Sequence, residues 1–197
     1  MNAFLMPKRL TFGKDISRIV FTEQTVHKTF KTPEIYETTV QFYSNYVQTR
    51  EDQRLFPKII AREAECQTVL FEHCGDLLNL WNLPENWEMQ LNALRSFFKD
   101  RQVLILDIRF MPHTPYVLNN LCVKNDRIYL VDVGFYTKKS ANYIDAYFEH
   151  LINKIHIYNR IKTRVWLIFP VHIFFYISWL ITDFIEKMRH RIPEEWP

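Results

Sequence analysis

The amino-acid sequence predicts an α+β fold with two lobes, in which a small antiparallel sheet with one helix precedes a reduced, mostly helical part. Short runs rich in β-branched and aromatic residues, separated by turn residues, dominate the first 75 positions and predict the sheet. After position 76, apolar residues recur mainly at helical spacing, with one strand–turn–strand pattern among them. A chain of 197 residues suits one domain or two small lobes that share a cleft.

The composition indicates a globular protein of a reducing compartment. Apolar residues make up 48% and aromatic residues 16% of the chain, which is enough for a substantial core. The net charge of +3 is too small to indicate a nucleic-acid partner, and none is expected. Cys66, Cys74 and Cys122 lie in or beside apolar segments and form no CxxC pair, which favours buried free thiols. The N-terminal apolar run is too short for a secretory signal, so we expect a cytoplasmic location.

The first strands are expected over 18–21 and 25–30, joined by a short turn. Side chains alternate along a strand, so Lys28 shares one face with the apolar Val26 and Phe30. A lysine between two apolar residues is unusual for a solvated surface. The structural alternative is a lysine of an edge strand that points to solvent.

The next segment has the signals of a helix start. Thr32 is a suitable N-cap, Pro33 suits the first helical position and Glu34 favours the first turn. Glu37 lies on a face beside the apolar stripe of this helix. That stripe consists of Tyr36, Val40, Tyr43 and Val47.

The remaining elements alternate between the two kinds of spacing. Strands are expected over 55–61 and 67–72, which complete the small sheet. Residues 76–104 are expected to be helical, with apolar residues on one face after Pro84. An amphipathic helix is expected over 140–155.

A hairpin with polar groups at one end is the most informative pattern in the chain. The apolar runs 121–123 and 128–131 flank the polar turn 124–127, so Asn120 and Asp132 are expected side by side at the open end. Two hard oxygen ligands there can bind Mg²⁺ and leave its other positions open to water and phosphate oxygens. This arrangement is typical of the metal-binding half of a phosphoryl-transfer site.

Glycine occurs only three times, at Gly13, Gly75 and Gly134, and such scarce glycine is expected where the backbone needs a positive φ or a close approach. In this order the three positions resemble the glycine-rich loop, the hinge and the Asp-Phe-Gly motif of the protein-kinase-like superfamily, with Val133 in place of Phe. The resemblance covers about residues 10–136. It implies ATP and Mg²⁺ as cofactors.

The resemblance also implies roles for individual residues. Lys28 takes the place of the strand lysine that pairs with the ATP phosphates, and a glutamate of the following helix pairs with it. Glu37 is preferred for that pairing because it lies further into the helix, and Glu34 is the alternative. The implied binding residues are Gly13, Lys28, Glu72 and Cys74 for ATP, the last two through the backbone of the hinge, and Asn120 and Asp132 for Mg²⁺.

The catalytic carboxylate implied is Asp107, which would orient the acceptor hydroxyl. Two features depart from the family: no His-Arg pair precedes Asp107, and thirteen positions instead of five separate it from Asn120. The extra segment 109–119 is expected to be a loop, which either bulges outward and leaves both ends in place or makes Asp107 structural. In the second case His113 is a substitute base or a loop histidine. Asn119 is the alternative metal ligand.

Residues 165–182 form an apolar stretch of eighteen residues without formal charge. Eighteen residues are just enough to span a bilayer, and Trp166 and Trp179 suit its interfaces, whereas Pro170 and His172 weaken a span. The other interpretation is a fully buried helix at the centre of a small second lobe. Both interpretations stay open, and so does association with a membrane surface.

The function expected is ATP- and Mg²⁺-dependent phosphoryl transfer to a hydroxyl acceptor, whether protein, sugar, lipid or lipopolysaccharide. One alternative is an inactive pseudokinase that acts as a binding or scaffold module, and another is a membrane-associated protein of different function. The expected organisation is a kinase-like core over 1–139, with lobes over about 10–75 and from 76, and a helical C-terminal part over 140–197.

Overall fold

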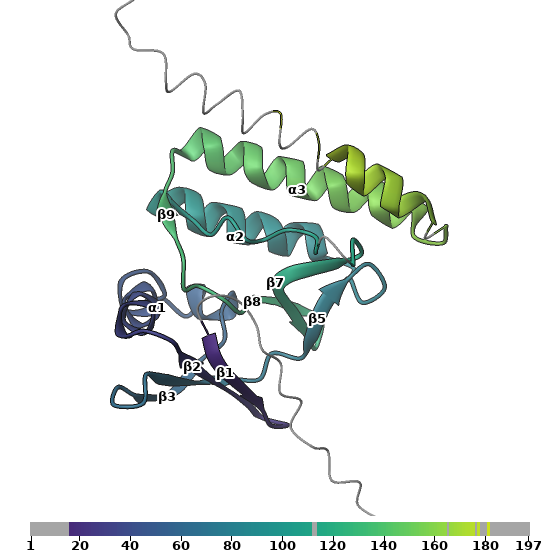
Figure 1. The fold of residues 1–197 in the computed structure, drawn as a ribbon. Coiled ribbons are helices and arrows are strands. Elements are labelled where there is room, and N and C mark those ends of the chain that lie inside the picture. Colours follow the sequence, from purple (N-terminus) through teal and green to yellow (C-terminus); the bar gives the residue numbers. More distant parts are fainter. Residues whose placement is uncertain (1–15, 112–113, 165, 176, 178–180, 182–197) are drawn as a thin grey trace, which may run out of the picture.

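The protein has an α+β fold with three antiparallel sheets, seen in a computed structural model (Figure 1). The largest sheet lies at one end of the molecule and two long helices lie side by side at the other. The buried apolar side chains form one core. The structure describes residues 16–111, 114–164, 166–175, 177 and 181. Gly13 and His113, named above as candidate residues, lie outside the described residues.

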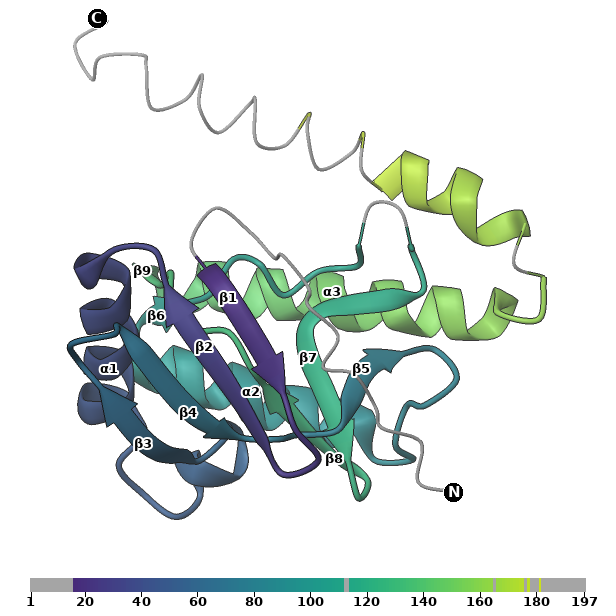
Figure 2. The same ribbon diagram turned by 60° about the horizontal axis from the view of Figure 1, so that its bottom comes forward.

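The largest sheet contains the predicted hairpin. Its strand order is β1 (Ile16–Phe21), β2 (Thr25–Phe30), β4 (Thr68–Glu72) and β3 (Ile59–Glu63) (Figure 2). Because β2 pairs with both β1 and β4, it is an interior strand. Val26, Lys28 and Phe30 are buried, which confirms the predicted face and excludes a solvent-facing edge lysine.

Helix α1 (Pro33–Tyr46) begins where the sequence predicts it, with a proline in its first turn. Thr32 has the extended backbone of an N-cap residue, but its side chain makes no capping hydrogen bond. The Phe42 ring is fully buried and lies 5.5 Å from the Phe56 ring and 6.3 Å from the Phe97 ring, centroid to centroid. Aromatic contacts of this kind anchor α1 to the rest of the core.

Residues 76–104 are helical only in α2 (Trp87–Arg101), so the prediction of a continuous helix was wrong. The stretch begins with a strand, β5 (Asp76–Asn79), and ends with another, β6 (Val103–Leu104). A turn after β5 explains the difference. Asn79 donates its N–H to Asn82 Oδ1 at 2.6 Å, and Asn79 Oδ1 accepts from the Trp81 N–H at 2.9 Å. Asparagine side chains that bond nearby backbone groups favour turns over helices.

A partly buried ion pair lies just before the position where the strand over 55–61 was expected to begin. A short 3₁₀ helix, η1 (Asp52–Arg54), turns the chain there, and β3 starts only at Ile59. Both carboxylate oxygens of Asp52 lie 2.8 Å from Nη2 of Arg101, and the Thr49 N–H donates to Oδ2 at 3.0 Å. This contact joins the segment after α1 to the end of α2.

The predicted hairpin consists of β7 (Val117–Lys124) and β8 (Arg127–Leu130). Its two turn residues, Asn125 and Asp126, have φ values of 51° and 57°, as a type I′ turn requires. β7 begins earlier than predicted, so the end of the expected loop 109–119 is strand. β5 pairs with β7, which gives a second sheet in the order β5-β7-β8.

Helix α3 (Ala141–Ile161) extends beyond the predicted range and lies beside α2 (Figure 1). Ser140 caps it, because its Oγ accepts a hydrogen bond from the Tyr143 N–H at 3.3 Å. Asp145 joins the two helices through Arg95 and Lys99 of α2, at 2.6 and 2.7 Å. Just before α3, β9 (Thr137–Lys138) pairs with β6.

The helical segment 166–175 contacts the rest of the protein through one face. Ile168 is fully buried, and His172 Nδ1 lies 3.0 Å from the Tyr158 hydroxyl of α3. Trp166 is 71% exposed and Phe174 is 70% exposed, so this segment is not the enclosed central helix of one interpretation. Among the described residues, no helix combines the length and the apolar composition that crossing a membrane requires.

Gly75 lies between the two larger sheets at a position that only glycine fits. Its φ is +81°, and a Cβ atom there would lie 2.1 Å from the carbonyl oxygen of Val123. This confirms at Gly75 the expected positive φ and close approach. The expectation fails at Gly134, where φ lies outside the left-handed region and an added Cβ would meet no atom nearer than 3.6 Å.

We predict that Gly75→Ala lowers the free energy of unfolding by about 3 kcal/mol, because a left-handed φ and a backbone clash both oppose a side chain. Gly134→Ala is the matched control and should change it by less than about 1 kcal/mol. Urea unfolding followed by circular dichroism measures both. Equal losses of unfolding free energy in Gly75→Ala and Gly134→Ala would contradict a special backbone requirement at Gly75.

Candidate functional site

The candidate site consists of Lys28, Asp107, Asn119, Asn120 and Asp132. Lys28 is 8% exposed, and its Nζ donates a hydrogen bond to the carbonyl oxygen of Val131 at 2.6 Å. The Phe71 ring lies 5.7 Å from the same ammonium group. Since Val131 directly precedes Asp132, strand β2 delivers the lysine to the open end of the β7–β8 hairpin.

The predicted ion pair between Lys28 and Glu37 is not formed among the described residues. Both Glu37 and the alternative, Glu34, are exposed. Ile35 and Thr39 of the same helix lie on the side that faces Gly134, at 3.7 Å from the position of an added Cβ. A glutamate at position 37 therefore lies on a different helix face from the residues that approach the site.

Asp107 and Asn120 meet, although thirteen positions separate them. The Asn119 and Asn120 amide nitrogens donate to Asp107 Oδ2 at 2.7 and 3.2 Å. The Asn119 N–H also donates to the Arg109 carbonyl at 2.7 Å, which closes the base of the intervening segment. The two ends of the insertion are therefore adjacent, and the choice between a catalytic and a structural Asp107 stays a prediction.

An unusual backbone conformation lets neighbouring asparagines bind the same carboxylate. Side chains alternate in a regular strand, so adjacent residues point to opposite faces. Asn120 has φ of 60°, in the left-handed region, and β7 is irregularly paired with β5. Asparagine tolerates this conformation better than most residues. The amide of Asn119, the alternative ligand, thereby reaches the same point as that of Asn120.

A backbone hydrogen bond connects the Asp107 cluster to Asp132. The Val131 N–H donates to the Asn120 carbonyl at 2.9 Å, so the residue before Asp132 and the first candidate ligand are fixed side by side. Asp132 Oδ1 accepts from the Gly134 N–H at 3.3 Å. Burial raises the pKa of Tyr43 in α1, and the charges of Cys74 and Asp132 raise it further.

The oxygen atoms of this arrangement suit a hard cation. No hydrogen bond from another described residue engages the Oδ1 atoms of Asn119 and Asn120 or the Oδ2 atom of Asp132. Amide and carboxylate oxygens are the donors that Mg²⁺ prefers. In the described part of the chain, this site included, no three His, Cys, Asp or Glu side chains gather as a metal-binding group.

The predicted hinge is a short connection with most of its polar groups engaged. The Glu72 N–H donates to the Lys58 carbonyl at 2.9 Å, and the His73 carbonyl accepts from Lys124 Nζ at 2.7 Å. Cys74 is buried, and burial raises the pKa of its thiol to about 12. Within the described residues, no hydrogen bond engages the backbone N–H of Cys74. That N–H is therefore a candidate hydrogen-bond donor of the hinge.

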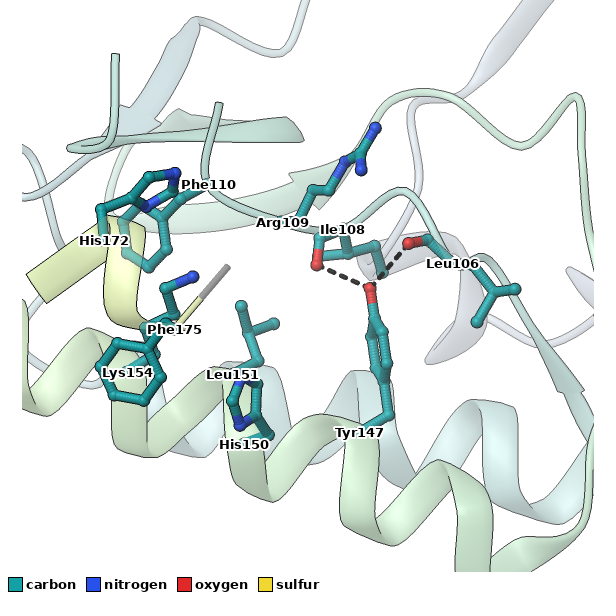
Figure 3. A pocket seen from close by; sticks show the side chains of 10 residues that line it. All are labelled: Leu106, Ile108, Arg109, Phe110, Tyr147, His150, Leu151, Lys154, His172 and Phe175. Atoms are coloured by element: carbon teal, nitrogen blue, oxygen red, sulfur yellow. Dashed lines mark hydrogen bonds between the residues drawn. The ribbon is translucent and has the colours of Figure 1, made fainter. Parts of the chain in front are cut away.

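Two residues that the sequence interpretation did not assign act on Asp107. Arg109 Nε lies 2.9 Å from Asp107 Oδ1, in an ion pair that is about half exposed. The Tyr147 hydroxyl of α3 lies 3.0 Å from the Leu106 carbonyl and 2.7 Å from the Ile108 carbonyl, on either side of Asp107 (Figure 3). Burial first, and then the charge of Asp107, raises the pKa of Tyr147.

Lys154 is the second unassigned cation near this loop. It is partly buried, and its ammonium lies 5.7 Å from the Phe110 ring, 5.6 Å from the Tyr158 ring and 5.2 Å from the Phe175 ring. Burial lowers the pKa of Lys154 to about 8. The sequence contained a signal for it, because position 154 falls three residues after Leu151 and four before Tyr158, both on the buried face of α3.

No protein-family model matches this chain, and no curated protein matches its sequence.

We predict that Lys154→Met raises the free energy of unfolding at pH 7 by about 1 kcal/mol. Below about pH 8 the lysine is charged in both states, and the folded state bears the full cost of burying it. As the pH rises from about 8 towards the unfolded value, only the folded state has lost the proton and the cost disappears. The advantage of Lys154→Met should therefore be constant below about pH 8 and shrink above it.

Urea unfolding of the wild type, Lys154→Met and the control Lys138→Met at about pH 7 and about pH 9.5 tests this. Lys138 is exposed in β9, so its replacement should leave the free energy of unfolding nearly unchanged at both pH values. A Lys154→Met variant that is less stable than the wild type at pH 7 would contradict the assigned burial cost.

Proposed function

We propose that this protein is an ATP- and Mg²⁺-dependent phosphotransferase of two-lobed, protein-kinase-like fold that acts on a hydroxyl acceptor. The observation that carries the proposal is the contact of Asp107 with Asn120, next to Val131 and Asp132. Val131, the residue before Asp132, donates its N–H to the Asn120 carbonyl, and the buried Lys28 bonds the Val131 carbonyl. The resemblance of the sequence motifs is consistent with this arrangement.

The nucleotide would lie between the largest sheet and the β7–β8 hairpin. Lys28 has one protein acceptor at 2.6 Å, so two of its three N–H donors remain for phosphate oxygens. A buried ammonium with a single carbonyl partner is costly unless an anion joins it. The N–H of Cys74 would donate to the adenine edge, as a hinge residue does.

The metal half of the site would use Asn120 and Asp132, with Asn119 as the alternative ligand. When bound there, Mg²⁺ would neutralise charge on the transferred phosphoryl group. The Asn120 carbonyl fixes the Val131 N–H at 2.9 Å, and this contact keeps the two ligand-bearing residues at a constant separation. The Gly134 N–H orients the Asp132 carboxylate from the other side.

Asp107 would orient the acceptor hydroxyl. Its carboxylate accepts hydrogen bonds from Asn119 and Asn120 and is paired with Arg109, so its direction is fixed. A carboxylate held in this way suits the positioning of a hydroxyl in a loose transition state, in which the hydroxyl proton leaves late. Tyr147 keeps the backbone on both sides of Asp107 in place.

We predict that ATP with Mg²⁺ stabilises the wild-type protein by about 2–4 kcal/mol at concentrations many times the Kd. The stabilisation should be lost in Asp132→Asn, which removes a metal-binding charge while keeping the shape of the side chain. Asp100→Asn, at an exposed carboxylate of α2, is the matched control and should respond as the wild type does. Thermal-shift titration with and without Mg²⁺ measures the effect.

A catalytically inactive pseudokinase is the second candidate. The ion pair of Asp107 with Arg109 and the exposed position of Glu37 favour it, because both depart from an assembled catalytic site. Consumption of ATP by the wild type, lost in Asp107→Asn, distinguishes the two candidates. ATP binding without consumption favours the pseudokinase, and no ATP binding at all overturns both.

We also propose that the helical segment after α3 rests on a membrane surface. Its outward face carries a row of apolar side chains at helical spacing, and Trp166 among them suits a membrane interface. The exposed members of this row are Trp166, Phe169, Ile173, Phe174, Ile177 and Ile181. The basic residues Lys162 and Arg164 precede it, which favours an anionic surface.

We predict that the protein sediments with vesicles made of equal parts of phosphatidylcholine and phosphatidylserine. The double variant Trp166→Gln/Phe174→Gln should bind them at least about tenfold more weakly, because it removes two side chains from the apolar face. Trp81→Gln, an exposed tryptophan outside this segment, is the control. Equal vesicle binding by all three proteins would contradict a membrane-binding role for the apolar face of this segment.

A further inference from the structure

A cavity of about 130 Å³ lies beside the loop that carries Asp107 (Figure 3). Its wall comes from three parts of the chain: residues 106–110, helix α3 and the segment that follows α3. The side chains of Ile108, Leu151 and Phe175 give it an apolar interior. A volume of this size suits one small chemical group.

The charged side chains of this cavity are cationic. Arg109 and Lys154 line it together with His150, His172 and Tyr147, and the described lining residues include no aspartate or glutamate. Arg109 is already paired with Asp107 at 2.9 Å. Burial and the charge of Lys154 lower the pKa values of His150 and His172, so both are neutral donors or acceptors at pH 7.

Lys154 is the cation of this wall that has no acidic partner. Among the described residues its ammonium contacts three aromatic faces and forms no ion pair. A lysine can reach solvent with its long stem, yet this one lies partly buried among the rings. Aromatic faces compensate only part of the desolvation of an ammonium group, and an anion would complete the compensation.

We propose that this cavity binds the anionic group of a small molecule, a carboxylate or a phosphate with an apolar portion attached, through Lys154. The anion would meet the ammonium directly, with His150 and His172 as hydrogen-bonding neighbours. The apolar portion would contact Ile108, Leu151 and Phe175.

The place of the cavity connects it to the proposed phosphotransfer. Leu106, Ile108 and Arg109 line it, and Asp107 lies between them in the chain but is not part of the wall. Resting on the proposed function, the inference is that the bound anion is part of the acceptor, held by Lys154 beside the loop that carries Asp107.

Benzoate and phenyl phosphate are suitable probes, and benzamide and benzyl alcohol are their uncharged counterparts. Thermal-shift titrations should show a rise in melting temperature with both anions and none with the neutral compounds. The rise should be absent in Lys154→Met and retained in Lys138→Met, in which an exposed lysine of β9 is replaced. Lys154→Met keeps the length of the stem, so circular dichroism should show a folded protein.

Two results would overturn the proposal: an equal rise in Lys154→Met, or no rise in the wild type with either anion. The ATP and Mg²⁺ shift, measured on the same samples, should persist in Lys154→Met. Its absence from the wild type would overturn the phosphotransferase proposal and leave the anion result standing. Vesicles with phosphatidic acid show whether the anionic group belongs to a lipid or to a soluble molecule. Vesicle binding that depends on Lys154 assigns a lipid headgroup, and no such binding assigns a soluble acid.

Discussion

The contact of Asp107 with Asn119 and Asn120 is the constraint on which the candidate site depends. Without it the carboxylate of Asp107 would have no bond to the hairpin. The amides of Asn119 and Asn120 bind Asp107, and the Asn119 N–H donates to the Arg109 carbonyl. These hydrogen bonds hold the two ends of the segment 109–119 next to each other. The left-handed backbone of Asn120 makes the contact possible, so a local strain supports the convergence of distant residues.

Local patterns in the sequence predicted much of the architecture and the position of single residues. Alternation in β2 predicted the buried face of Lys28, and the turn chemistry around residue 125 predicted the β7–β8 hairpin. The predictions failed where side chains act on the backbone at short range, as Asn79 does in the turn that interrupts the expected helix. The joint action of Asn119 and Asn120 depends on one φ angle, which no residue pattern encodes.

Lys28 is buried and Lys154 is partly buried, and the two lysines have different surroundings. Lys28 has a carbonyl partner and lies against one ring, whereas among the described residues the ammonium of Lys154 contacts aromatic faces. Both positions lower the stability of the folded chain relative to an apolar residue of the same shape. Groups that are unfavourable for folding and lie beside a polar cluster or a cavity are common at binding sites, because a ligand then supplies the missing interaction.

The junction at Gly75 also constrains how the two larger sheets move. The chain passes from β4 to β5 with its backbone pressed against the Val123 carbonyl, and Lys124 of the same strand bonds the His73 carbonyl. Contacts with β7 therefore restrict the backbone of this connection, which is not a flexible hinge. A displacement of β7 would also displace residues 73–75, so we expect the hairpin and this connection to move together.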